Sequence, residues 1–151
     1  VLAESFETSV PWSQLLTLCD NVKRRVHEEH RAHGLPGRPF ITCRVTQVYD
    51  TGACVYFYLG HYYKGIDNPS EIFAAVEHAA REEILASGGS LSHHHGVGKL
   101  RKPFLPEIMS DTALAWRDAA KTAMDPSNVF GCQNTTVQTE SGDEKDSKQA
   151  S

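Results

Sequence analysis

The stretch Pro39–Tyr63, PFITCRVTQVYDTGACVYFYLGHYY, decides the fold. It contains two runs that are rich in β-branched and aromatic residues, and the turn-forming residues DTG at 50–52 separate them. Residues of these types fit the pleated, half-buried surface of a sheet, and a short Gly-containing break between two such runs is typical of a hairpin. The sequence therefore predicts two antiparallel strands.

The second predicted strand has two unlike faces, because successive side chains of a strand point to opposite sides. One face carries Val55, Phe57 and Leu59, and the other carries the less apolar set that includes Tyr56. Whether Arg44 shares the face of Tyr56 depends on the length of the loop, since one step of register exchanges the faces. The sequence leaves that point open.

One long helix is expected before the hairpin in the sequence, and a second one is expected after it. The first carries apolar residues at three-to-four spacing and is closed by Gly34; these residues are Leu15, Leu18, Val22 and Val26. The second begins with Asn68 as a cap, Pro69 in the first turn and Glu71 as a capping-box partner, and it ends at Gly88-Gly89.

A last helix is expected to start at Pro106 or Ser110 and to end at Asp125-Pro126. The chain enters its first helical pattern almost at once, has no initial methionine, and is expected to be a fragment of a longer protein. The order helix, strand, strand, helix, short extended piece, helix predicts an α+β fold, in which helices cover one face of an antiparallel sheet. We expect one domain over residues 1–134 and a disordered tail over 135–151.

Composition excludes several classes of protein. A net charge of −4 provides no basic field for a phosphate backbone, so no nucleic-acid partner is expected. The four cysteines are scattered and form no CxxC pair, which favours free thiols in a reducing compartment; a bridge between Cys43 and Cys54 across the hairpin is the exception considered. No apolar run is long enough to span a bilayer.

Three consecutive histidines, His93, His94 and His95, stand out in the segment GGSLSHHHGVG. In an extended segment His93 and His95 lie on one side and His94 on the other, so at most two could share a metal ion. A loop whose imidazoles only form hydrogen bonds is an alternative. The third interpretation is chemistry, because an imidazole exchanges protons near neutral pH.

Four sequence blocks, in this order, resemble the alkyldihydroxyacetonephosphate synthase family, which belongs to the vanillyl-alcohol-oxidase type of FAD-linked enzymes. The blocks are ESFETSVPW at 4–12, TCRVTQVYDTGACVYFY at 42–58, AAREEILASGGS at 79–90 and SLSHHHGVGKLRK at 90–102. The resemblance implies that residues 1–134 form the C-terminal cap, or substrate, domain of an FAD-linked enzyme. The flavin-binding domain of that family would precede this chain.

The resemblance also implies an activity and a set of site residues. The family exchanges the acyl chain of acyl-dihydroxyacetone phosphate for a long-chain fatty alcohol, which gives alkyl-dihydroxyacetone phosphate and a fatty acid. FAD is the implied cofactor. Tyr56 matches the tyrosine that moves the proton at the reacting carbon, and His93, His94 and His95 line the same pocket. His94, His95 and Asn134 are the implied FAD contacts, and no metal is expected.

Location and partners are expected from the same resemblance. They are a peroxisome or a related organelle, a homodimer, and peripheral contact with a membrane. Two other functions remain open: a flavin-dependent oxidase or dehydrogenase of the same superfamily, and a module in which the histidines bind a metal or a partner.

Overall fold

The computed structural model describes residues 1–131, which fall into two compact units divided between Gly96 and Val97. The predicted boundary at residue 134, the tail over 135–151, Asn134 and Cys132 all lie outside the described residues. Within the described residues no helix is long and apolar enough to cross a membrane. The first unit, Val1–Gly96, contains the sheet, the long helices and the histidine segment.

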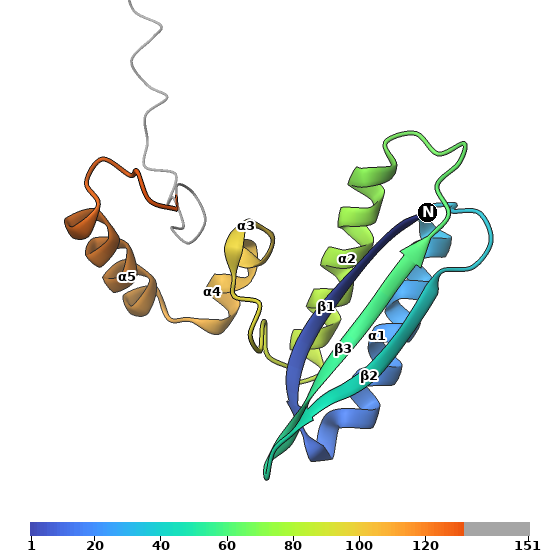
Figure 1. Cartoon of the computed structure of the whole chain (residues 1–151), viewed down its shortest axis with the longest axis horizontal. Coiled ribbons are helices and arrows are strands. Elements are labelled where there is room, and N and C mark those ends of the chain that lie inside the picture. The colour runs from blue at the N-terminus through green and yellow to red at the C-terminus, as the bar shows by residue number, and fades with distance from the viewer. Residues whose placement is uncertain (132–151) are drawn as a thin grey trace, which may run out of the picture. The chain divides into compact units, whose positions relative to one another are not determined.

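The first unit is built on a three-stranded antiparallel sheet with the order β1-β3-β2 (Figure 1). The strands are β1 (Leu2–Pro11), β2 (Phe40–Val48) and β3 (Gly52–His61). The predicted hairpin of β2 and β3 is confirmed, and β3 is the central strand. A short 3-10 turn, η1 (Trp12–Gln14), follows β1.

Strand β1 is a correction to the sequence analysis, which placed no strand before the first helix. Phe6 and Val10 are its only buried large apolar residues, while Glu7 and Thr8 are fully buried polar residues. A strand that buries polar residues lacks the simple apolar–polar alternation by which strands are predicted. Its assignment depends on what covers it, and that part of the chain is far away in sequence.

A bulge decides the face of Arg44. The amide of Tyr49 donates to the Gly52 carbonyl at 2.8 Å, which closes a short hairpin loop. The register then shifts between Val45 and Gln47, so that Arg44 lies opposite Tyr56. Without this bulge, Arg44 would lie opposite Phe57, and its side chain would point toward the core.

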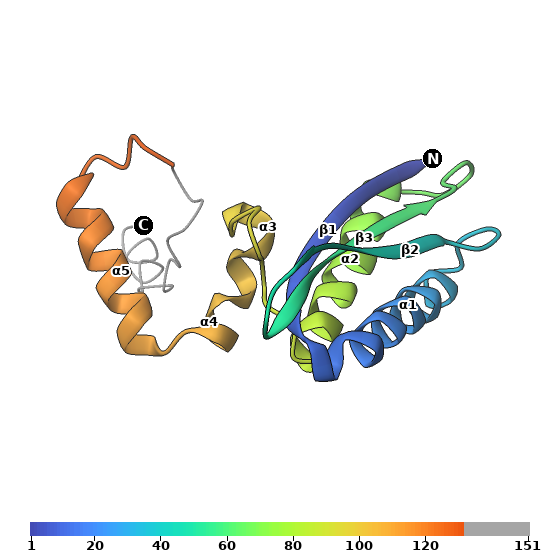
Figure 2. The ribbon, with the colours of Figure 1, turned by 60° about the horizontal axis from the view of Figure 1, so that its bottom comes forward.

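Both long helices are confirmed and cover the same face of the sheet (Figure 2). Helix α1 (Leu15–Ala32) buries Leu18, Val22 and Val26, and helix α2 (Pro69–Ala86) buries Phe73, Val76, Ala80 and Ile84. These residues meet Phe6, Val55, Phe57 and Leu59 of the sheet in one apolar core. The rings of Phe6 and Phe57 stack with centroids 5.3 Å apart.

The start of α2 differs from the expected capping box. Asn68 has a left-handed backbone, with φ 51° and ψ 50°, and its side chain makes no capping hydrogen bond. Its carbonyl accepts instead, from the amide of Glu71 at 3.1 Å. Pro69 occupies the first turn as expected, where the missing N–H costs nothing.

The described part of the second unit is helical. It contains α3 (Gly98–Arg101), the 3-10 turn η2 (Lys102–Phe104), α4 (Leu105–Ile108) and α5 (Asp111–Met124). Of the two predicted starts for the last helix, Ser110 is confirmed, because its hydroxyl accepts from the Ala113 amide at 3.3 Å. The short extended piece expected before this helix is instead a bent segment followed by short helical turns.

Candidate active site

The histidine segment reaches the sheet through the two glycines that follow α2, Gly88 and Gly89. Gly88 has φ 81°, and a Cβ on Gly89 would lie 2.7 Å from side-chain atoms of Ile84, Leu18 and Thr8. The chain can therefore turn out of the helix and pass closely beneath β1 only where side chains are absent.

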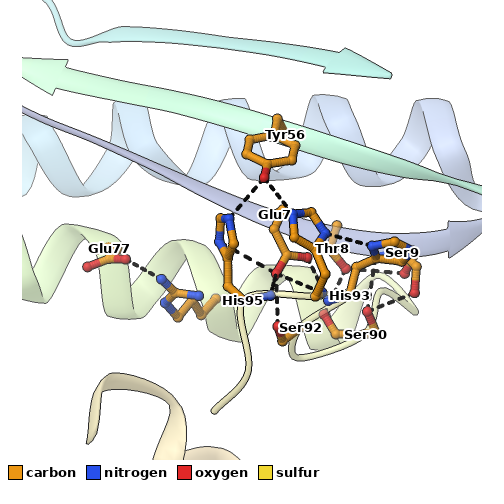
Figure 3. Close-up of polar contacts among 11 residues, drawn as sticks. Glu7, Thr8, Ser9, Tyr56, Glu77, Ser90, Ser92, His93 and His95 are labelled. Atoms are coloured by element: carbon orange, nitrogen blue, oxygen red, sulfur yellow. Dashed lines mark hydrogen bonds and ion pairs between the residues drawn. The ribbon is translucent and has the colours of Figure 1, made fainter. Parts of the chain in front are cut away.

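Ser90 fastens the segment to β1. Its amide donates to the Ser9 carbonyl at 2.9 Å, and its hydroxyl lies 2.9 Å from both the amide and the hydroxyl of Ser9. The hydroxyl of Thr8 donates to the Ser90 carbonyl at 2.7 Å. These contacts fix where the following residues lie over the sheet (Figure 3).

The carboxylate of Glu7, which is fully buried, is the anchor of the histidines. Its Oε2 accepts from the His93 amide at 2.6 Å, and its Oε1 accepts from the His95 amide at 3.0 Å and the His94 amide at 3.3 Å. The Ser92 hydroxyl, which donates to Oε1 at 2.8 Å, is the fourth donor to this carboxylate. One buried charge thus bends the backbone of the three histidines around itself.

The charge of Glu7 is stabilised by these donors. Burial alone raises the pKa of a carboxyl, but the amides of His95 and His93, the Ser92 hydroxyl and the His94 amide outweigh it, and the pKa of Glu7 falls to about 2. Glu7 is therefore ionised at neutral pH and acts only as an acceptor.

The phenol of Tyr56 lies between two of the imidazoles (Figure 3). Its hydroxyl oxygen is 2.6 Å from Nε2 of His94 and 2.9 Å from Nε2 of His95. Tyr56 stands opposite Glu7 in the β1–β3 pairing, on the face that α1 and α2 leave free. The structure therefore brings together the tyrosine and the histidines that the sequence had singled out.

The expected alternation of the histidines is wrong. His94 and His95 both reach Tyr56, and the segment 92–95 has no strand pairing. Side chains alternate only where the backbone is extended, and the hydrogen bonds to Glu7 bend it here. His93 lies beside His94, with their Nδ1 atoms 2.8 Å apart.

Two residues of this cluster were not predicted as site residues. Tyr49, next to the hairpin loop, places its hydroxyl 2.8 Å from Nε2 of His93, and Glu7 lies beneath the whole segment. A single glutamate inside a strand gives no strong local signal of a site. A partial one exists in the pattern of Phe6, Glu7 and Thr8, where a charge interrupts an otherwise β-forming run.

Burial raises the pKa of Tyr56, and the charge of Glu7 and the neighbouring Cys54 and Tyr58 add to that effect, while Arg44 opposes it. The guanidinium of Arg44 donates to the Tyr58 hydroxyl at 2.9 Å. Tyr56 is thus a protonated phenol near neutral pH, and it needs a neighbouring base before it can accept a proton.

Four potential metal ligands also gather here, since one ligand atom from each of Glu7, Cys54, His93 and His94 lies within 4.8 Å of the others. Tetrahedral zinc with Zn–N bonds of about 2.0–2.1 Å holds its nitrogen ligands roughly 3.3 Å apart. The 2.8 Å between the two Nδ1 atoms is shorter and fits a shared proton better. Cys54 is a free thiol, as are Cys19 and Cys43, and Cys43 lies opposite Phe57 rather than Cys54.

Comparison with known proteins identifies the family of this chain. The family model of FAD linked oxidases, C-terminal domain, matches residues 1–133. Alkyldihydroxyacetonephosphate synthase of Caenorhabditis elegans is 50% identical over 89% of this chain and 22% of its own length. The synthase of Trypanosoma brucei brucei is 30% identical over 84% of this chain and 20% of its own length.

A solved structure of alkyldihydroxyacetonephosphate synthase superimposes with a TM-score of 0.54 and 19% identity, over 83% of this chain and 19% of that one; it supports the fold. The chain spans about a fifth of the length of the curated relatives. The resemblance inferred from the sequence blocks is confirmed by these matches. The chain therefore belongs to the family of C-terminal domains of FAD-linked oxidases.

Proposed function

We propose that this chain forms the substrate domain of an FAD-dependent ether-lipid synthase. The enzyme exchanges the acyl chain of acyl-dihydroxyacetone phosphate for a long-chain fatty alcohol, and a fatty acid leaves. The observation that carries the proposal is the placement of the Tyr56 hydroxyl 2.6 and 2.9 Å from two imidazoles, on the sheet face opposite α1 and α2. The names of the curated relatives support the reaction.

The residues present fit a flavin. The face around Tyr56 offers exposed imidazoles at His94 and His95 and the exposed guanidinium of Arg44. Aromatic and N–H groups of this kind suit a flat ring that accepts hydrogen bonds. His94 and His95 would hold the flavin; Asn134, also proposed as a contact, lies outside the described residues. Bound FAD supplies an electron-deficient ring that accepts electron density from the substrate.

Tyr56 is the group that takes and returns the proton at the reacting carbon. Because the raised pKa keeps the phenol protonated, Tyr56 must first give its own proton to an imidazole before the resulting phenolate can accept the substrate proton. The imidazoles are within hydrogen-bond reach, which is the geometric requirement for this transfer. Reversal of the same steps returns both protons, so the exchange needs no net oxidant.

Tyr56→Phe in the intact flavoprotein tests this role. We expect turnover in an alkyl-exchange assay to fall by about 10²–10⁴-fold, because the positioned proton carrier is lost. The visible flavin spectrum should remain, since the ring packing is kept. Tyr58→Phe is the matched control: it lies on the same strand face, with ring centroids 6.2 Å apart, and should keep most of the activity. Near-normal turnover of Tyr56→Phe would exclude the role.

A metal-binding function is the second candidate, which the grouping of Glu7, Cys54, His93 and His94 favours. Elemental analysis of the dialysed intact protein separates the two. The flavin proposal expects FAD and no stoichiometric zinc or copper, whereas one bound ion per chain would support the metal function. A flavin oxidase of the same superfamily would instead reduce oxygen or a dye with an α-hydroxy acid.

Location and assembly are proposed from the family resemblance alone. We place the intact protein in peroxisomes or a related organelle, as a homodimer with peripheral membrane contact. Fluorescence microscopy of the tagged protein tests the first statement, and light scattering with vesicle flotation tests the others.

A further inference from the structure

The site residues form one continuous series of contacts from the solvent-exposed end of the hairpin to the buried carboxylate. The order is Tyr49, His93, His94, Tyr56, His95, Glu7, with distances of 2.8, 2.8, 2.6 and 2.9 Å between the first five and 3.6 Å from His95 Nδ1 to Glu7 Oε1. A neutral imidazole has one N–H and one lone pair, and a phenol has one proton. Once the donor in one of these hydrogen bonds is known, the donor in the next hydrogen bond is therefore fixed as well.

The Glu7 end of the series is constrained by charge. The contact of 3.6 Å is longer than a hydrogen bond, but the negative charge of the carboxylate favours a His95 tautomer whose Nδ1–H points toward it. The Nε2 of His95 then carries the lone pair and accepts a hydrogen bond from the Tyr56 hydroxyl, at 2.9 Å. The opposite tautomer would turn a lone pair toward a buried negative charge.

The remaining donors follow from this choice. Because the only O–H group of Tyr56 donates its hydrogen bond to His95, His94 must donate to the phenol oxygen from Nε2. The Nδ1 of His94 is then an acceptor, and His93 donates to it from Nδ1. Finally, the Nε2 of His93 accepts from the hydroxyl of Tyr49.

The Tyr49 end presents one competing contact. The Tyr49 hydroxyl also lies 3.1 Å from Oε1 of Gln47, and donation to that oxygen would reverse the whole series. Gln47 is exposed, and its amide can rotate to present its NH₂ group at little cost, whereas a carboxylate cannot become a donor. The charged end therefore decides the direction.

We infer that Glu7 is a positioning residue that sets the tautomers of the histidines and so gives His94 and His95 different tasks. His95 is the base: the Tyr56 O–H bond breaks, an N–H bond forms at Nε2 of His95, and the imidazolium faces the Glu7 carboxylate. His94 is the donor that stabilises the phenolate. The division of tasks in catalysis rests on the proposed function, but the tautomers do not.

The tautomers can be measured directly. Two-bond ¹H–¹⁵N correlation spectra of the full chain labelled with ¹⁵N-histidine, above the pH at which imidazoles titrate, report which nitrogen carries the proton. We expect Nδ1–H on His95 and His93 and Nε2–H on His94. Glu7→Gln should reduce the Nδ1–H population of His95, while Glu82→Gln, an exposed residue of α2, should not. Nε2–H on His95 in the unaltered chain overturns the inference.

Kinetics of the intact flavoprotein provide the second test. A glutamine amide can still donate to the Tyr56 oxygen but cannot act as a base. His95→Gln should therefore lower turnover by about 10²–10⁴-fold. The fold-loss of turnover for His94→Gln should be smaller by a factor of about ten or more, because only the strength of one hydrogen bond changes. Retained flavin absorbance shows that both variants fold. Equal losses contradict the assignment of tasks.

The two proposals fail in different ways. If the intact protein exchanges no alkyl chains, the proposed function fails, and the spectra still decide the tautomers. If exchange occurs and Tyr56→Phe abolishes it, but the two histidine variants behave alike, only the present inference fails.

Discussion

The two faces of the sheet are held by different forces, although the same strands build both. On one face Phe6 and Phe57 pack against helices from either side of the hairpin, and the energy is spread over many apolar contacts. On the other face lie Glu7, which follows Phe6 in β1, and Tyr56, which precedes Phe57 in β3. This face is held by the histidine loop, whose amides donate to the single charge of Glu7. Apolar burial tolerates small changes of geometry, whereas a buried charge requires each donor.

The comparison explains where stability and chemistry lie. The helix-covered face can supply stability because hydrophobic burial is non-directional. The Glu7 face supplies directed hydrogen bonds, which are what a proton transfer needs. Substitutions on the two faces should therefore differ both in size and in which property they change.

The largest loss of stability is expected on the helix-covered face. Phe57→Ala removes a fully buried ring that stacks on Phe6, and it should lower the free energy of unfolding by about 3–5 kcal/mol. Urea denaturation measures it. Tyr58→Phe, the next residue on the opposite face, is the control and should change stability little. A loss below about 1 kcal/mol for Phe57→Ala would contradict this account of the core.

Acid should weaken the other face. The pKa of Glu7 is lowered from 4.5 to about 2 in the folded chain, so its contribution is complete above pH 4.5 and disappears as the pH falls toward 2. The full contribution is on the order of 3 kcal/mol.

The measurement is urea denaturation of the unaltered chain and of Glu7→Gln across this pH range. The difference in unfolding free energy between them should shrink as the pH falls. A constant difference would show that the charge of Glu7 is not what the loop amides stabilise.

The close approach of the histidine loop to the sheet predicts a smaller effect. Gly89→Ala forces a Cβ to within 2.7 Å of Ile84, Leu18 and Thr8, and should cost about 1–3 kcal/mol of unfolding free energy. Gly60→Ala is the matched control, because its nearest neighbour lies at 3.4 Å. The two should be compared by thermal unfolding, and equal losses would argue against tight packing at Gly89.

The smallest effect is expected at the exposed edge of the Tyr56 face. Arg44→Ala removes a solvent-exposed hydrogen bond to Tyr58 and should cost less than about 1 kcal/mol. Urea denaturation again provides the value. A loss above about 2 kcal/mol would mean that this part of the face contributes to stability like the core does.

Much of the fold could be predicted because its signals are local. The alternation around Val55 and Phe57 and the spacing of Leu18, Val22 and Val26 each reflect burial of one continuous element. Strand β1 could not be found this way, since its buried Glu7 and Thr8 are covered by residues more than eighty positions away. The family resemblance supplied Tyr56 and the histidines as residues of one pocket, but not which imidazole nitrogens contact the phenol or that Glu7 holds their backbone.

The sequence by itself determined the α+β class, the hairpin, the two long helices and the unlike faces of β3, because side-chain periodicity follows from backbone geometry within one element. Only the tertiary structure decided that β3 is central, that a bulge turns Arg44 toward Tyr56, and that Glu7 bends the histidine segment so that His94 and His95 meet the Tyr56 phenol. These features depend on hydrogen bonds between residues distant in the chain. No local pattern encodes them.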